Sequence, residues 1–476
     1  MTLRPPDYLP TRRRFFRLTA SAAAALALPK IACADSSLIT GSIYVDETAE
    51  LHPIPPNFTG LSYESAQLAN PDFFVSTNRE LVRLFRELSP CGVIRLGGGS
   101  SDYTTFSTKS VPPPFETFGP DTSKTVKKGT ITSVVALQNL RSFLDAANWT
   151  CLYGLNLGQG TKHNAAAEAE AVHRILGSRL MAFQIGNEPD TFRHFRSNGY
   201  SPQQFISEWI DFHDAIVARV PQARFAGPDI SNKLSYLAAF AQEAQHYPDI
   251  VLLTLHYYAM GPAGNPGATL QNLLSPDPRL TTLKWRNIPI VQQAMRTSHL
   301  PCRISEVNSC WNGGESGVSN VFASALWCAD MMLHFASLGI AGVNLHGGGN
   351  GIYSPIVGSP TSGFTKRPEF FGMQFAQHFA GATLLRSDLQ CNSDRVAAYA
   401  SRSEKGIKQL AIINKTNSPA ELNITGSWSK HRWHATLLNA PSLEAQSRIE
   451  FRRTAMHHGT LPVPSHSAFF LAADHH

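Results

Sequence analysis

Two glutamates from distant parts of the sequence, Glu188 and Glu306, have surroundings that suit acid chemistry. Each closes a short apolar run typical of a buried strand, in Asn187-Glu188-Pro189 and in Ile304-Ser305-Glu306. A single Asn-Glu is more often an ordinary strand-end charge, but two such ends facing one pocket are far more specific. Carboxyl groups about 5 to 5.5 Å apart can break a glycosidic bond, because one protonates the leaving oxygen while the other attacks the anomeric carbon.

The two glutamates can meet only if strands far apart in the sequence run parallel around one pocket. From about Pro56 to Phe364, short apolar runs alternate with amphipathic helical patterns, such as those after Ser201-Pro202 and over 320–336. The strand candidates are Gly60 to Tyr63, Val93 to Leu96, Leu152 to Leu157, Met181 to Ile185, Arg224 to Ala226, Ile250 to Leu255, Cys302 to Ser305 and Gly342 to Leu345. Eight such strands predict a (β/α)8 TIM barrel over 57–378 in an α/β fold, with both glutamates at its C-terminal mouth.

The last hundred residues follow a different pattern. After Phe379, short alternating strands predict a C-terminal β-sandwich domain over 379–476. They are Val396 to Ser401, Gln409 to Asn414, His434 to Leu438 and Ala468 to Leu471. A further strand, Leu38 to Val45, lies within an N-terminal segment, 35–56, that we expect to join this sandwich. Long Gly- and Pro-rich stretches at 101–128 and 261–279 are expected to form functional loops over the barrel mouth.

The first 34 residues read as a targeting segment. Thr11-Arg12-Arg13-Arg14-Phe15-Phe16-Arg17 precedes an apolar run and then Ala32-Cys33-Ala34, an A-x-A cleavage pattern. The twin arginines predict export by the bacterial Tat route to the periplasm or the outside, with cleavage before Asp35. The run is too short to span a membrane, although an anchor or a disordered basic tail is the alternative.

Composition excludes several other classes of protein. The formal charge is +6, and most of it lies in the first 34 residues, so the mature chain is close to neutral. The mature chain therefore lacks the excess of basic residues with which proteins bind nucleic acid or an anionic membrane. The cysteines show neither C-x-x-C pairs nor metal spacing, and the sequence does not settle whether Cys302 and Cys310 form a disulfide. Metal, nucleotide and serine-hydrolase motifs are lacking, so we expect no metal and no organic cofactor.

Polar residues close every predicted barrel strand, where barrel enzymes place their active sites. They are Ser62-Tyr63-Glu64, Arg95, Asn156, Asn187-Glu188, Asp229, His256-Tyr257-Tyr258, Glu306 and Asn344 to His346. Arg95 can orient the nucleophile, bind substrate or form a structural ion pair. We interpret His256 as a packing or loop histidine, because both acid-base roles are already filled. Tyr63, Tyr257, Tyr353 and Trp311 stack on sugar faces or simply pack at the mouth.

These motifs resemble those of glycoside hydrolase family 79, the family of β-glucuronidases and heparanase, within the clan of retaining barrel glycosidases. The matches are Asn57-Phe58-Thr59-Gly60-Leu61-Ser62-Tyr63-Glu64, Arg95-Leu96-Gly97-Gly98, Gln184-Ile185-Gly186-Asn187-Glu188-Pro189, His256-Tyr257-Tyr258 and Ser305-Glu306. The resemblance implies that Glu188 is the acid/base, that Glu306 is the nucleophile and that Asn187 binds the sugar 2-hydroxyl. It also implies that Glu64, Tyr258, Gly313 and Tyr353 surround the C5 substituent of the sugar.

One position departs from the family pattern. Trp311 stands where the family's uronate binders carry a tyrosine, five residues after the nucleophile. An indole is larger than a phenol and aims its N–H differently, which raises a neutral hexoside as substrate. We therefore expect an exo-acting retaining β-glucuronidase, with a neutral β-hexosidase of the β-glucosidase type as the alternative on the same scaffold. An exported carbohydrate-binding protein without catalysis is the alternative from another class. Oligomeric state and aglycone stay open.

Overall fold

A computed structural model describes residues 38–108, 130–196, 199–277, 279, 287–347, 351–454 and 460–474. The predicted targeting segment and most of the predicted loop at 101–128 lie outside these residues. Among the helices that are described, none combines the length and the hydrophobicity needed to cross a membrane. The six cysteines from Cys91 to Cys391 are free thiols.

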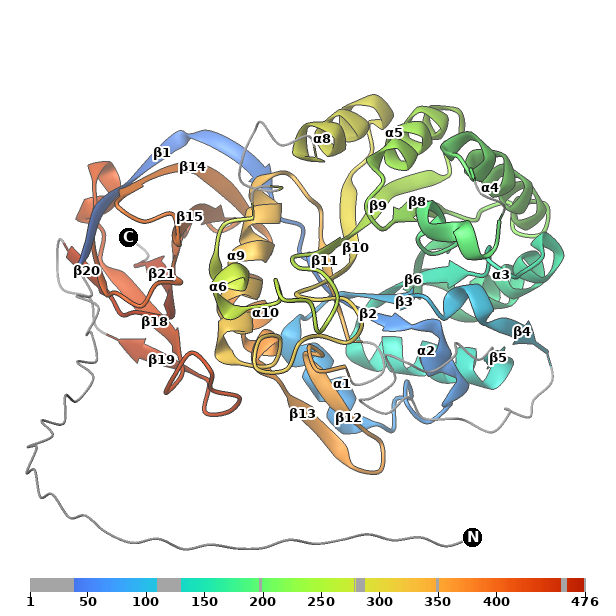
Figure 1. Cartoon of the computed structure of the whole chain (residues 1–476), viewed down its shortest axis with the longest axis horizontal. Coiled ribbons are helices and arrows are strands. Elements are labelled where there is room, and N and C mark those ends of the chain that lie inside the picture. Colours follow the sequence, from blue (N-terminus) through green and yellow to red (C-terminus); the bar gives the residue numbers. More distant parts are fainter. Residues whose placement is uncertain are drawn as a thin grey trace, which may run out of the picture. The chain divides into compact units, whose positions relative to one another are not determined.

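The centre of the fold is a closed barrel of parallel strands, in the order β10-β11-β2-β3-β6-β7-β8-β9 (Figure 1). Its strands are β2 (Thr59–Glu64), β3 (Val93–Gly97), β6 (Thr150–Leu155), β7 (Leu180–Ile185), β8 (Phe225–Ile230), β9 (Ile250–Tyr258), β10 (Cys302–Asn308) and β11 (Val343–His346). Both faces of these strands are covered, which explains why they read as nearly continuous apolar runs. The predicted barrel is confirmed, and each predicted strand overlaps an observed one.

Helices surround the barrel on its outer face (Figure 1). They are α1 (Arg79–Leu88), α2 (Val134–Ala147), α3 (Lys162–Leu176), α4 (Pro202–Val217), α5 (Leu234–Glu243), α8 (Asn287–Ser298), α9 (Phe322–Ser337) and α10 (Pro368–Gln377). The start of α4 follows from its sequence, because the Ser201 hydroxyl accepts from the Gln204 amide and the Gln204 side chain accepts from the Ser201 amide. Shorter elements interrupt the connections between barrel strands and helices: α6 (Leu270–Leu274), the pair β4 (Thr105–Ser107) and β5 (Ile131–Ser133), and the hairpin β12 (Ile356–Ser359) and β13 (Gly363–Lys366).

The remaining strands form a nine-stranded sheet that curls over a second apolar core, the predicted sandwich. The strand order is β19-β18-β21-β16-β15-β14-β1-β17-β20. Their bounds are β1 (Ile39–Pro53), β14 (Ala382–Cys391), β15 (Val396–Ser403), β16 (Lys408–Asn414), β17 (Ala420–Ile424), β18 (Trp433–Asn439), β19 (Glu450–Thr454), β20 (Thr460–Val463) and β21 (Ser467–Ala473).

The N-terminal strand lies inside this C-terminal sheet (Figure 1). Strand β1 pairs antiparallel with β14 and parallel with β17, so that Ile43 lies opposite both Leu389 and Ile424. Its inward side chains Ile39, Ile43 and Val45 are buried in the second core. The exact domain boundaries, 35–56 included, stay predictions.

A buried polar contact joins the barrel helix α9 to the sheet. The carboxylate of Asp330 is paired with the ammonium of Lys415 and accepts a hydrogen bond of 2.6 Å from the Tyr399 hydroxyl. Burial raises the pKa of Asp330, but the Lys415 charge and these hydrogen bonds outweigh burial and lower it. The Lys415 side chain is only 6% exposed, so its charge has little access to bulk water.

We predict that Asp330→Asn lowers the free energy of unfolding by about 2 kcal/mol, because it leaves the Lys415 charge buried without a carboxylate. Urea unfolding measures the change. The matched control is Asp211→Asn, which removes the carboxylate of an exposed pair with Lys162 and should cost less than about 0.5 kcal/mol. Equal effects of the two substitutions would contradict the proposed role of the buried contact.

Candidate active site

Glu188 and Glu306 lie in one cavity at the C-terminal mouth of the barrel. Glu188 lies three residues beyond the end of β7, and Glu306 lies within β10. A carboxylate oxygen of Glu188 and one of Glu306 lie within 4.8 Å of each other. This separation is close to the 5–5.5 Å of retaining glycosidases and well below the 6.5–9.5 Å of inverting ones. Both side chains line a cavity of about 1280 Å³, which has room for a sugar and part of its aglycone.

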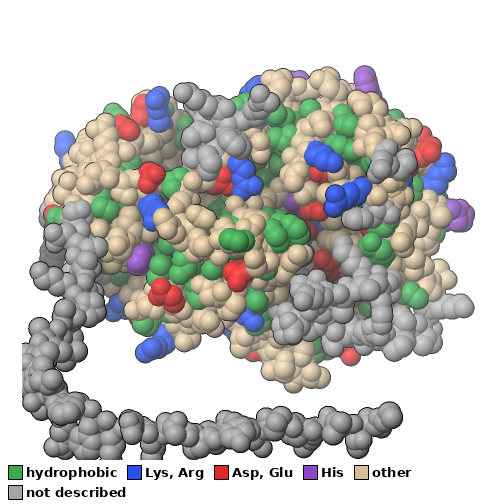
Figure 2. Space-filling view, in the orientation of Figure 1, with side chains coloured by type: hydrophobic (Ala, Val, Ile, Leu, Met, Phe, Trp, Pro, Cys, Tyr) green, Lys and Arg blue, Asp and Glu red, His purple; other side chains and the backbone are tan. Residues whose placement is uncertain are grey.

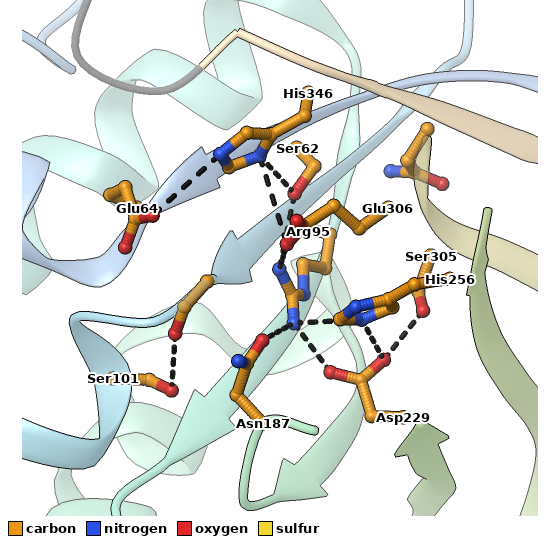
Figure 3. A network of polar contacts seen from close by, with 12 residues as sticks. Ser62, Glu64, Arg95, Ser101, Asn187, Asp229, His256, Ser305, Glu306 and His346 are labelled. Carbon is orange, nitrogen blue, oxygen red and sulfur yellow. Dashed lines mark hydrogen bonds and ion pairs between the residues drawn. The ribbon is translucent and has the colours of Figure 1, made fainter. Parts of the chain in front are cut away.

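The carboxylate of Glu306 is held in its ionised form (Figure 3). Arg95 Nη1 donates to Oε2 at 2.7 Å, and the Tyr258 hydroxyl donates to Oε1 at 2.6 Å. Burial raises the pKa of Glu306, but the charges of His346, His256 and Arg95 outweigh it and lower the pKa to about 2. Glu306 is therefore a carboxylate throughout the neutral range, as a nucleophile must be.

Arg95 connects several of the predicted site residues (Figure 3). Its side chain is 1% exposed and is paired with both Glu306 and Asp229. Nη2 also donates to the Asn187 side-chain oxygen at 2.7 Å, which fixes the orientation of that amide. Arg95 is absent from the cavity lining, whereas Asn187 belongs to it. Of the three roles that the sequence leaves open for Arg95, this geometry supports orienting the nucleophile.

Asp229 and His256 form a chain that ends on Glu188. His256 Nε2 lies 3.2 Å from Asp229 Oδ1, and its Nδ1 lies 2.9 Å from Glu188 Oε1. Burial lowers the pKa of His256, but the charges of Asp229 and Glu306 outweigh it and raise the pKa to about 10. His256 is buried with both ring nitrogens in contact with carboxylates, and its interpretation as a core or loop histidine rather than a catalytic one stays a prediction. In the sequence, Asp229 and His256 each stand out as a strand-end residue, but no sequence pattern indicates that the two are in contact.

The backbone around Glu188 and Asp229 is held in an unusual conformation. Both residues are in the left-handed region, with φ of 49° at Glu188 and 59° at Asp229. Residues with a side chain adopt this region rarely, at a cost of about 1–3 kcal/mol each, and such positions cluster at active sites. The Glu188 amide donates to the Asp229 carbonyl at 2.8 Å, so the two strand ends support each other.

Glu64 and His346 form a second acidic and basic pair across the cavity. The Glu64 carboxylate accepts from the Ser100 amide at 2.7 Å and lies 3.7 Å from His346 Nε2. Burial raises the pKa of Glu64, but the His346 hydrogen bond and charge outweigh it and lower the pKa. In His346, burial lowers the pKa, but the charges of Glu306 and Glu64 raise it. The sequence marks His346 only as a strand-end residue and gives no signal for Ser100.

The other predicted residues around the sugar also line the cavity: Tyr258, Trp311, Gly313 and Tyr353. The Gly313 carbonyl accepts from the Tyr353 amide at 3.2 Å, which ties the loop after β10 to the loop after β11. Burial raises the pKa of Tyr258 and of Tyr353 well above the usual value, so both phenols remain hydrogen-bond donors. Trp311 is 45% exposed.

The predicted role of Tyr63 in substrate binding is wrong. Its side chain is 2% exposed and is not part of the cavity lining. The ring contacts Phe74 edge-on, at 5.2 Å between ring centroids, and lies beside Phe73 and Phe85. Because neighbours on a strand point to opposite faces, Glu64 faces the cavity and Tyr63 faces the helices.

Comparisons with known proteins agree with this geometry. A scan against models of protein families finds no match. The chain is 26% identical over 414 residues to a β-glucuronidase of Aspergillus niger, covering 80% of this chain and 75% of that one. It is also 26% identical over 422 residues to a β-glucuronidase of Neurospora crassa, covering 78% of this chain and 74% of that one. The chain is a glycoside hydrolase. The resemblance to the β-glucuronidase family is confirmed.

Solved structures support the fold of this glycoside hydrolase. A 4-O-α-L-rhamnosyl-β-D-glucuronidase from Fusarium oxysporum has a TM-score of 0.70 at 17% identity, covering 91% of this chain and 99% of that one. A family 51 arabinofuranosidase from Xanthomonas axonopodis pv. citri has a TM-score of 0.67 at 14% identity, covering 92% of this chain and 100% of that one. At these identities the likeness concerns the architecture of barrel and sheet.

Because the native glycoside hydrolase holds a proton on His256 that the unfolded chain loses near pH 6.5, its stability should fall as the pH rises from about 6.5 to 10. We predict that His256→Gln removes much of this dependence, so that the unfolding temperature of the wild type falls several degrees further than that of the variant. Calorimetry at successive pH values measures it. His163→Gln, a change at an exposed position of α3, should follow the wild type. Parallel curves for the wild type and His256→Gln would refute the prediction.

Proposed function

We propose that this glycoside hydrolase is an exo-acting retaining β-glucuronidase, in which Glu306 is the nucleophile and Glu188 the acid/base. The observation that carries the mechanism is the approach of a Glu188 oxygen to within 4.8 Å of a Glu306 oxygen. The β-glucuronidases of Aspergillus niger and Neurospora crassa, which match over most of the chain, support the choice of sugar.

The proposed reaction takes two steps. Glu306 attacks the anomeric carbon while Glu188 gives its proton to the glycosidic oxygen, so the aglycone leaves as an alcohol and a glycosyl ester forms on Glu306. Glu188, now a carboxylate, takes a proton from water, and the hydroxide attacks the same carbon and releases Glu306. Arg95 and Tyr258 hold the Glu306 carboxylate toward the anomeric carbon, through hydrogen bonds of 2.7 and 2.6 Å.

Residues beside Glu306 form a wall that suits the carboxylate of a glucuronide. Tyr353 offers a phenolic donor, and the charges of Glu306 and Glu64 raise the pKa of His346, which favours its protonated form. Two observations favour a neutral β-hexoside as the second candidate. Trp311 stands at the family's tyrosine position, and the lowered pKa of Glu64 places a negative charge in the same wall.

Export through the predicted Tat signal, to the periplasm or the outside, is part of the proposal. In the face that Figure 2 shows, acidic and basic side chains are interspersed. This supports a sugar-processing enzyme whose own surface is close to neutral. Fractionating cells that express the full chain, and sequencing the N-terminus of the exported protein, tests cleavage before Asp35.

Substitution of the two glutamates tests the roles. We predict that Glu306→Gln lowers kcat on an aryl glycoside by at least about 10⁴-fold, because the glycosyl ester cannot form. Glu188→Ala should lower activity on a poor leaving group by about 10²- to 10⁴-fold, and azide should partly restore turnover of an activated substrate by replacing water as the attacking group. Near-native activity of Glu306→Gln would refute the assignment. If the wild type hydrolyses none of these substrates, a carbohydrate-binding protein would be favoured instead.

A panel of 4-nitrophenyl β-glycosides tests the sugar. We predict that the glucuronide has the highest kcat/KM, and that Tyr353→Phe lowers it by roughly 10- to 100-fold, since a hydrogen bond to a charged group contributes about 1.5–3 kcal/mol. The same substitution should cost much less on the glucoside. A wild type that prefers the glucoside, with equal losses on both substrates in Tyr353→Phe, would support the neutral β-hexosidase instead.

A further inference from the structure

The cavity that holds Glu188 is also lined by apolar residues that the proposed reaction does not use, some of them on the segment that follows Glu188. Under the proposed function Glu188 protonates the glycosidic oxygen, so the side chains next to it on this side face the aglycone. After Glu188 the chain enters a 3-10 helix, Pro189–His194, and then Phe195. Phe192 and Phe195 both line the cavity, together with Tyr103 from the loop after β3 and Leu234 at the start of α5. We call these four residues the aromatic wall.

The rings of the aromatic wall support one another. Phe195 lies 5.3 Å from Tyr103 and 5.1 Å from Phe192 between ring centroids, and the Phe192 contact is edge-on. Phe192 and Leu234 are buried, whereas Tyr103 and Phe195 are half-buried where they line the cavity. The wall is thus built before a ligand arrives, which limits the entropy lost on binding.

A cation anchors the aromatic wall from behind. The Arg196 guanidinium lies 5.7 Å from the centre of the Phe192 ring. It also donates to the carbonyls of Leu157 and Gly158, each at 3.0 Å, and is paired with Glu208 at 2.9 Å. Its charge is therefore committed to the scaffold and does not face a ligand in the cavity.

The charges around the cavity oppose a polyanionic substrate. In the described part of the lining, the cationic side chains are His256, His346 and Arg279, and each already contacts carboxylates. Arg279 is bound by Asp277 and by the carbonyls of Tyr258 and Ala259. Binding a sulfated or uronate-rich chain requires arginine or lysine side chains that are free to meet its anionic groups.

We propose that the aromatic wall is a subsite for a planar aromatic aglycone, so that the enzyme acts on aryl glycosides of small molecules. This inference rests on the proposed function, because Glu188 must be the proton donor for the wall to face the leaving group. Apolar rings stack on Phe195 and Tyr103, and the cationic side chains of the described lining are already paired with carboxylates, which disfavours an acidic polysaccharide.

Three substrates that carry the same sugar test the subsite. A 2-naphthyl glycoside fills it, a β-glycosyl fluoride has a single-atom leaving group, and a sulfated oligosaccharide ending in that sugar places anionic groups there. We expect the wild type to have a kcat/KM on the naphthyl glycoside at least tenfold above that on the oligosaccharide. In Phe195→Ala the ratio of naphthyl to fluoride kcat/KM should fall about 5- to 20-fold, the loss expected for one aromatic contact.

The controls separate the two proposals. Phe451→Ala removes a half-buried phenylalanine on β19, outside the cavity, and should keep the wild-type ratio. Tyr103→Leu gives a second measurement of the ratio should Phe195→Ala fail to fold. An unchanged ratio in both wall variants, with fluoride hydrolysis intact, overturns the subsite but leaves the proposed function. A faster reaction on the sulfated oligosaccharide also overturns the subsite. No hydrolysis of any of the three substrates overturns both.

Discussion

Arg95 carries a charge at the centre of the barrel with 1% of its surface exposed, so carboxylates rather than water must balance it. Removing an ion from water costs several kcal/mol, and only well-placed partners offset that cost. Asp229 and Glu306 are these partners, and Asn187, Ser62 and Gln184 accept further hydrogen bonds from the guanidinium. A lysine would present a point charge, whereas the planar fork of arginine reaches several acceptors at once. The position and the ionisation of Glu306 therefore both depend on one side chain.

In the rest of the site, each histidine likewise lies between two carboxylates, so positive and negative groups alternate. His256 lies between Asp229 and Glu188, and His346 lies between Glu64 and Glu306. In the proposed first step, Glu306 loses its negative charge as the ester forms, and Glu188 gains one as it gives up its proton. His256 faces both carboxylates, since one ring nitrogen lies within 4.8 Å of an oxygen of each. The charge moves from one neighbour of His256 to the other, so the surrounding dipoles need little reorganisation.

The sequence predicts the parts of this site that depend on chain position, and misses those that depend on tertiary packing. Buried parallel strands read as apolar runs and end in polar residues, so the barrel, Glu188 and Glu306 follow from local patterns. The link from Asp229 through His256 to Glu188 joins the ends of separate strands, and its register is not written in any one of them. Tyr63 was open to prediction: strand alternation places it opposite Glu64, and that rule outweighs the general association of tyrosine with sugar binding.

The residues proposed to select the sugar and the aglycone lie on different elements from those proposed to carry out catalysis. The solved structures of similar fold include a glucuronidase, an arabinofuranosidase and a xyloglucanase, at identities between 11% and 17%. One architecture thus serves different sugars, and the fold cannot by itself determine the glycone. In this chain the proposed nucleophile Glu306 and its partners Arg95 and Tyr258 lie on barrel strands, whereas Trp311, Gly313, Tyr353 and the aromatic wall lie mostly on the loops that follow them. Substitutions in those loops can change which sugar and aglycone fit without disturbing the central ion pair, because Arg95 and Asp229 are buried beneath the cavity lining.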